Sequence, residues 1–160
     1  MMYMLYLGVL AMVERFMQMA IKEAKKAYAI DETPIGAVIV RDGKVISRGY
    51  NKRETKKNAL MHAEIIAIDK ACRKLGGWRL PECEIYVTLE PCPMCMGAIL
   101  QSRIEKVYFG AYDHKSGCLG SACDLSQVLP HKITYQGGIL KAESEEILKS
   151  FFKNLRKKDK

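Results

Sequence analysis

The chain has 160 residues, of which 49% are apolar, and this size suits one globular domain with a full hydrophobic core. Six cysteines are too few for a disulfide scaffold, and no basic segment of a secretory signal precedes them. We therefore exclude a small secreted disulfide-rich protein, expect a cytoplasmic location, and ask where the net charge of +8 is placed.

The N-terminal residues 1–11, "MMYMLYLGVLA", are apolar and uncharged. They are too few to span a bilayer, so we expect no membrane role. We interpret them as a disordered extension that precedes a single domain at residues 12–160. Apolar and small residues then recur at spacings of three and four, which predicts a first helix over about residues 13–29. These residues are Phe16, Met19, Ala20, Ala24 and Ala27.

The rest of the chain alternates between strand and helix patterns. Two β-branched runs, "TPIGAVIV" and "KVISRGY", flank the turn signal "RDG" and predict a hairpin. Residues 63–75 have helical spacing and stop at "GGW", where glycine ends the helix and where we expect Trp78 in the core. The later segments are the strand "EIYVTL", the helix "CPMCMGAILQS", the strand "KVYFGAY", a short strand at 133–135 and a closing helix at 142–157. This alternation predicts an α/β layer sandwich.

Positive charge is concentrated in two segments. Residues 41–57 contain seven Lys/Arg and two acidic residues, and residues 149–160 contain six and one. Two such clusters favour a polyanionic partner. Lysine-rich surfaces are also ordinary solubility features, so charge alone does not decide between the two interpretations.

A pair of cysteines, Cys92 and Cys95, flanks a proline that opens a predicted helix. This spacing turns both thiolates toward one point at the positive end of the helix. The pair alone fits a structural zinc half-site, a redox pair or two packed thiols. His62 adds a third potential ligand, and three protein ligands are the set that catalytic zinc uses while its fourth position stays open for water.

A carboxylate, Glu64, follows His62 by two residues. A closed structural zinc site has no use for it, whereas a catalytic site needs a general acid or base beside the metal. Residues i and i+2 of a regular helix face different ways, so both must lie at the first turn. The alternative is that His62 caps the helix and Glu64 complements the helix dipole. The following "PCPMC" favours the catalytic interpretation.

The two segments "HAE" and "PCPMC" match the H-x-E…P-C-x-x-C signature of zinc-dependent nucleoside and nucleobase deaminases. From Phe16 to Arg156 the chain resembles the bacterial tRNA-specific adenosine deaminases. The resemblance is carried by "PIGAVIV", "GYN", "HAEIIAI", "WRL", "IYVTLEPC", "SRI", "VYFGAYDHKSGCLGS" and "FFKNLR". One departure is "ALMHAE", because family members usually have "PTAHAE" and this chain places Leu60 and Met61 ahead of the histidine.

The resemblance implies a three-layer α/β/α sandwich with a mixed central sheet of about five strands. It implies one Zn²⁺ per chain, with Glu64 as the proton shuttle and with His62, Cys92 and Cys95 as ligands. Its implied activity is hydrolytic deamination of adenosine to inosine at the wobble position of a tRNA anticodon, by zinc-activated water in a homodimer.

The resemblance also implies substrate contacts. Asn51 would contact the flipped base or its ribose, and Asp113 and Lys115 would hold neighbouring nucleotides. Phe152 and Arg156 lie in the family's C-terminal helix, which touches the anticodon loop.

Three alternative functions stay open. A free guanine deaminase shares the zinc site, and Pro93 occurs in that family too, but it should not need two basic clusters. A free cytidine deaminase typically has cysteine in place of His62. A non-enzymatic, zinc-stabilised RNA-binding module would need no carboxylate at the metal, and Glu64 argues against it.

Overall fold

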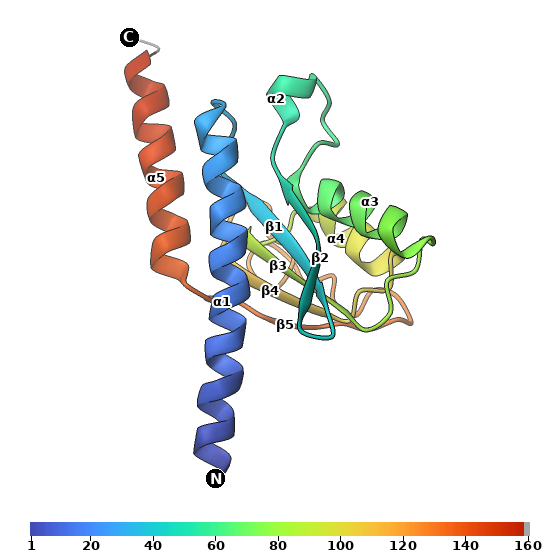
Figure 1. Cartoon of the computed structure of the whole chain (residues 1–160). Helices are drawn as coiled ribbons and strands as arrows, with labels where there is room; N and C mark the ends of the chain where they lie inside the picture. Colours follow the sequence, from blue (N-terminus) through green and yellow to red (C-terminus); the bar gives the residue numbers. More distant parts are fainter. Residues whose placement is uncertain (159–160) are drawn as a thin grey trace.

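A computed structural model describes residues 1–158 as a central five-stranded sheet flanked by helices (Figure 1). The strands are β1 (Gly36–Arg41), β2 (Lys44–Tyr50), β3 (Cys83–Leu89), β4 (Lys106–Ala111) and β5 (Thr134–Gln136). The helices are α1 (Met2–Ala29), α2 (Arg53–Lys56), α3 (Ala63–Leu75), α4 (Pro93–Gln101) and α5 (Lys141–Lys158).

The strand order in the sheet is β2-β1-β3-β4-β5. The predicted hairpin is confirmed, since β1 pairs with β2 antiparallel. Strand β1 also pairs antiparallel with β3, whereas β3, β4 and β5 run parallel to one another, so the sheet is mixed. Helices α1 and α5 cover one face and α3 and α4 cover the other (Figure 1). The three-layer α/β/α sandwich is therefore confirmed.

Strand β1 lies at the centre of two hydrophobic cores. Its Ala37 and Ile39 pack with residues of α3 and α4, whereas Val38 and Val40 pack with residues of α1. Successive side chains of a strand point to opposite faces, so a strand covered on both faces reads as a continuous apolar run. The run "AVIV" has this property, and all four residues are buried.

Helix α1 differs from its prediction, because it begins at Met2 and continues through the segment expected to be disordered. This N-terminal part extends away from the body of the protein (Figure 1), and Met2, Tyr3 and Met4 are at least 73% exposed. This part contains no proline, and it continues directly into the C-terminal part of α1, which packing on the sheet already holds in helical form. Extending an existing helix by further residues costs little free energy. By length and composition α1 could cross a membrane, but core helices pass the same test, and the residues from Phe16 to Ala27 pack on the sheet.

The position of Trp78 also differs from its prediction. Its side chain is 54% exposed, and the guanidinium of Arg79 lies 4.1 Å from its ring centroid. Helix α3 ends at Gly76 in the left-handed conformation, and the fully buried side chain after this turn is Leu80. Leu80 therefore takes the core position that we expected for the tryptophan.

Candidate active site

The N-terminal ends of α3 and α4 meet on one face of the sheet. His62 is the N-cap residue of α3, Cys92 is the N-cap residue of α4, and Cys95 lies in the first turn of α4. The polypeptide enters both helices in extended conformation. This entry directs the three side chains that the sequence predicts as ligands toward one point, where two helix N-termini favour negative charge.

The three ligand atoms have the spacing of a metal site. The Nδ1 atom of His62 lies 3.7 Å from the sulfur of Cys92 and 3.6 Å from that of Cys95. All the ligand atoms lie within 4.8 Å of one another. Tetrahedral zinc with ordinary Zn–S and Zn–N bonds holds nitrogen and sulfur about 3.6 Å apart. The residues therefore fit zinc, and three ligands leave a fourth position for a water molecule.

The electrostatics of the metal-free centre also favour a cation. Hydrogen bonds from the Cys95 thiol and from the His62 ring lower the pKa of Cys92 to about 4. The hydrogen bond to Cys92 raises the pKa of His62, while the pKa of Cys95 rises because it shares a proton with Cys92 and is buried. One thiolate is thus already present before a metal binds.

Glu64 lies in the first turn of α3 and is only 4% exposed. Burial raises its pKa to about 7, and the neighbouring Cys92 adds to the shift. A carboxyl group with a pKa near neutrality can both accept and release a proton at physiological pH. The predicted shuttle therefore borders the predicted metal site and has the acid strength that a shuttle needs.

Asn51 follows β2 and lies beside the same centre. The N–H of Lys52 donates to the carbonyl of Met61 at 2.9 Å, which holds this segment next to His62. The Asn51 amide is buried and donates to Glu32 Oε2 at 3.2 Å. Strand β2 can approach α3 so closely because Gly49 has no Cβ, which would lie 2.2 Å from the carbonyl oxygen of Ala63.

Glu32 is a buried carboxylate beside Asn51 that the sequence did not single out. It is 1% exposed, and besides Asn51 it accepts a hydrogen bond of 2.6 Å from the N–H of Thr55 in α2. A carboxylate only accepts, so the amide nitrogen of Asn51 must face Glu32 and its oxygen faces away. The only sequence signal was an acidic residue just ahead of the buried strand in "DETPIGAVIV".

The loop after β4 carries Asp113 and Lys115. The Asp113 carboxylate accepts hydrogen bonds from the N–H groups of Lys115 and Ser116, at 3.0 and 3.2 Å. Burial alone would raise the pKa of Asp113, but the hydrogen bonds from Ser116 and Lys115 lower it overall. The N–H of Cys118 donates to the carbonyl of Pro91 at 2.9 Å, so this loop runs beside the residue that precedes Cys92.

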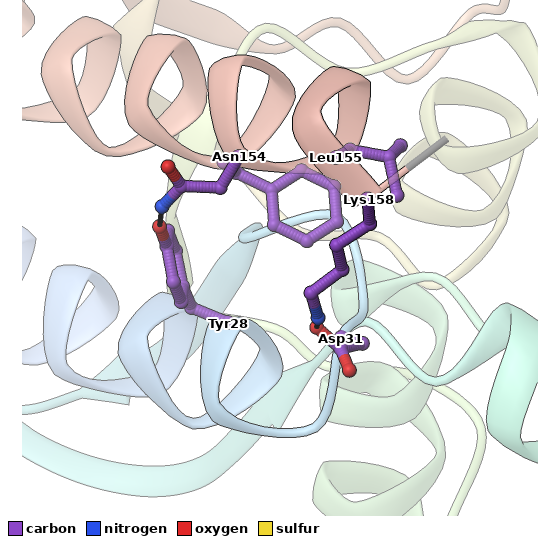
Figure 2. Close-up of a pocket in the computed structure, with 6 residues that line it drawn as sticks. Tyr28, Asp31, Asn154, Leu155 and Lys158 are labelled. Carbon is purple, nitrogen blue, oxygen red and sulfur yellow. Dashed lines mark hydrogen bonds and ion pairs between the residues drawn. The ribbon is translucent and has the colours of Figure 1, made fainter. Parts of the chain in front are cut away.

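Phe152 and Arg156 lie in α5, on the opposite face of the sheet from α3 and α4, and both are exposed. The end of α5 is fastened to the end of α1 (Figure 2). Asn154 donates to the Tyr28 hydroxyl at 2.7 Å, and Lys158 pairs with Asp31 at 2.7 Å. The buried anchor of this contact is Phe151, whose ring packs edge-on against Tyr28.

Comparisons with known proteins agree with the zinc-compatible geometry of this site. A model of the cytidine and deoxycytidylate deaminase zinc-binding region matches residues 11–111, which include all the predicted ligands. The tRNA-specific adenosine deaminase of Bacillus subtilis is 50% identical over 149 residues, 92% of each chain. That of Aquifex aeolicus is 44% identical over 145 residues, covering 89% of this chain and 95% of the relative.

Solved structures separate the candidate families further. A structure from work on A-to-I editing by tRNA:A34 deaminases at the wobble position has a TM-score of 0.78 and 43% identity, covering 84% of this chain and 99% of that chain. Guanine deaminase from Bacillus subtilis has a TM-score of 0.60 and 42% identity, covering 62% and 64%. The guanine deaminase interpretation is thus the less supported one. This chain belongs to the cytidine and deoxycytidylate deaminase family and, within it, to the tRNA-specific adenosine deaminases.

Proposed function

We propose that this protein hydrolyses adenosine to inosine and ammonia at the wobble position of a tRNA anticodon. The observation that carries the proposal is the convergence of His62, Cys92 and Cys95 at zinc-compatible distances beside a buried Glu64. The zinc-binding family model and the identity to tRNA-specific adenosine deaminases support the same conclusion.

His62, Cys92 and Cys95 would hold the metal, and Glu64 would move the protons. Zinc held by these residues would supply the Lewis acidity that makes water a nucleophile toward C6 of adenine. Glu64 accepts one proton of that water and delivers it to ring N1. It then carries the second proton to the departing amino group, which leaves as ammonia. Two thiolates cancel the formal charge of zinc and would acidify the water less, so a proton acceptor beside the metal is needed.

The substrate contacts follow from where the remaining residues lie. We assign Asn51, beside His62, to the base or ribose of the target nucleotide, and Asp113 and Lys115 to its neighbours. We assign Phe152 and Arg156 to the anticodon loop. An anticodon loop is already unpaired, so placing its wobble base in a pocket costs little. The exposed basic side chains of α5 supply attraction for its phosphates.

A second copy of the chain is the proposed partner beside the active site. Leu60 is 54% exposed and lines a hollow with Met61, Ile65 and Ile66, two residues ahead of His62. The same hollow is also lined by four charged residues, Lys52, Lys56, Asp69 and Arg73. Exposed apolar side chains that have polar ones around them are typical of protein–protein interfaces. We expect sedimentation analysis to show a homodimer and Leu60→Lys to shift it toward monomer. A wild-type monomer at micromolar concentration would contradict this assignment.

The proposed setting is the cytoplasm, with tRNA and no membrane as partner. The direct test incubates the zinc-loaded protein with total tRNA and, separately, with guanine. Inosine at the wobble position together with released ammonia is expected, with the Glu64→Ala variant as the control. Deamination of guanine without any inosine in tRNA would replace the proposal by the guanine deaminase alternative.

A further inference from the structure

A second buried carboxylate, Glu90, lies outside the proposed chemistry. It lies between β3 and Cys92 and is 1% exposed. Within residues 1–158 it forms no ion pair with a basic side chain. A buried charged group without a cation costs free energy unless hydrogen bonds replace its water. Its hydrogen-bond partners therefore indicate what it does.

Among the residues that the structure describes, all the hydrogen-bond partners of the Glu90 side chain come from one loop, the segment 112–121 after β4. The Oε2 atom accepts from the N–H of Asp113 at 3.1 Å. The Oε1 atom accepts from the N–H groups of Leu119 and Ser121, at 2.9 and 3.1 Å, and the Ser121 hydroxyl donates to Oε2. These N–H groups lie in a loop and donate to the carboxylate. Glu90 thus supplies the acceptors that carbonyl groups supply within a helix or sheet.

The loop wraps closely around this side chain. A Cβ added at Gly117 would lie 2.4 Å from the carboxyl carbon of Glu90, so no larger residue fits there without moving the loop. Two backbone bonds close the arrangement on either side. The N–H of Glu90 donates to Ala111 at 2.9 Å, and Cys118 donates to Pro91 at 2.9 Å.

We propose that Glu90 is a positioning residue that fixes the loop of Asp113 and Lys115 relative to the zinc site. One short segment links the loop to the metal site, because Glu90 holds the backbone of Asp113 and the predicted ligand Cys92 follows Glu90 by two residues. The consequence for substrate rests on the proposed function, because it requires that this loop contact nucleotides next to the target.

A glutamine at this position would keep the shape but not the bonding. Its NH₂ group would face an N–H donor on one side, and at least one buried donor would lose its acceptor. Glu90→Gln should therefore loosen the loop while leaving the ligands His62, Cys92 and Cys95 in place.

The first experiment needs no substrate. Amide hydrogen exchange of the zinc-loaded protein should show Asp113, Leu119 and Ser121 exchanging at least about tenfold faster in Glu90→Gln than in the wild type. The amide of Val87 in β3 is the internal reference and should not change. Zinc should remain at one per chain. Unchanged exchange, or loss of zinc, would overturn the proposal.

The second experiment measures deamination of tRNA. Glu90→Gln should raise KM by about tenfold with a smaller change in kcat, because the loop acts in binding. In an Asp113→Ala background the same change should add little, since both act through one loop. The matched control is Glu32→Gln, which changes an equally buried carboxylate that is bonded to Asn51. Its fold-increase in KM should multiply with that of Asp113→Ala, because the two residues lie in different segments. If the fold-increases in KM of Glu90→Gln and Asp113→Ala multiplied in the double variant, the proposal would be contradicted.

If Glu90→Gln does not yield folded protein, Gly117→Ala tests the same relationship with the carboxylate retained. It should speed exchange in the loop and raise KM as Glu90→Gln would, and a wild-type KM with unchanged exchange would overturn the proposal. Failure of the proposed function is distinguishable, because a wild type that makes no inosine would still show the exchange result.

Discussion

The Nδ1 atom of His62 lies 3.6 Å from the sulfur of Cys95, thirty-three residues later in the chain. Each residue lies at the start of a helix, and the two helices pack side by side on one face of the sheet. The distance is that of two ligands on one tetrahedral zinc ion. The fold therefore preforms the site, and the chemistry assigned to it can be tested residue by residue.

Glu64→Ala should keep zinc near one per chain while the rate of deamination falls by at least about a hundredfold, because general acid and base catalysis contributes that much. Zinc content by mass spectrometry and inosine formation check the two halves. The matched variant is Cys92→Ala, which should lose zinc and lower Tm, since metal binding adds to folding stability. Zinc loss in Glu64→Ala would instead make Glu64 a structural residue.

Removing zinc with a chelator should make Cys92 the preferred target of iodoacetamide at pH 6. Its pKa of about 4 leaves it a thiolate there, whereas burial raises the pKa of Cys83 to about 11 and that of Cys118 to about 12. Only the thiolate is nucleophilic, so the rate should be flat from pH 5 to 7 and fall as the pH drops through about 4. Peptide mass spectrometry measures the modification. Equal labelling of Cys83 and Cys92 would contradict this prediction.

Neutralising the exposed basic side chains of α5 should reduce the salt dependence of tRNA binding. The triple variant Lys153→Gln, Arg156→Gln and Lys157→Gln keeps the buried Phe151 and the Lys158–Asp31 pair. If two of the three contact phosphates, the slope of log affinity against log salt should flatten by about 1.4. Fluorescence anisotropy at several salt concentrations measures it.

The control removes the same charge elsewhere, with Lys70→Gln, Lys74→Gln and Lys132→Gln, and should leave the slope unchanged. An unaltered slope in the α5 variant would mean that this cluster only aids solubility. The cluster at residues 41–57 would then be the candidate contact.

Starting the chain at Met12 should leave zinc content, Tm and activity unchanged. The deleted part of α1 is almost entirely exposed and contributes nothing to either hydrophobic core. Removing it takes away exposed apolar surface, so the shortened protein should stay free of aggregates up to a higher protein concentration than the full chain. Light scattering measures this difference. A large loss of activity would show that the segment has a function.

Local signals in the sequence were sufficient for the metal site and most elements. Cys92 and Cys95 are three residues apart, His62 and Glu64 are two apart, and the glycines that end α3 follow it directly. The two halves of the metal site are 30 residues apart, but their side chains are of the types that zinc needs, so the sequence marks them. Glu90 could not be found in this way, because its partners, 23 to 31 residues away, are mainly backbone groups that any sequence would supply. The same holds for Glu32, whose partners Asn51 and Thr55 follow it by 19 and 23 residues.

Two predictions failed for a related reason. Residues 1–11 have no apolar periodicity, so the pattern gave no helix, yet a helix already fixed on the sheet extends through them. Trp78 was expected in the core because it follows the glycines that end a helix. The turn at Gly76 decided otherwise, since it leads the chain so that Leu80 is buried. Both outcomes depend on neighbours in space and not on the residue itself.

The protruding start of α1 is a suitable place to attach another protein or a surface. The two ends of the described chain lie at opposite ends of the molecule, with the start of α1 away from α5 (Figure 1). Ten helical residues, Met2–Ala11, are a rigid spacer of about 15 Å. A fusion partner or a surface tether joined at the N-terminus would thus be held off the catalytic body and would leave α5 accessible. A tag at the C-terminus would lie next to the basic side chains that are proposed to meet RNA.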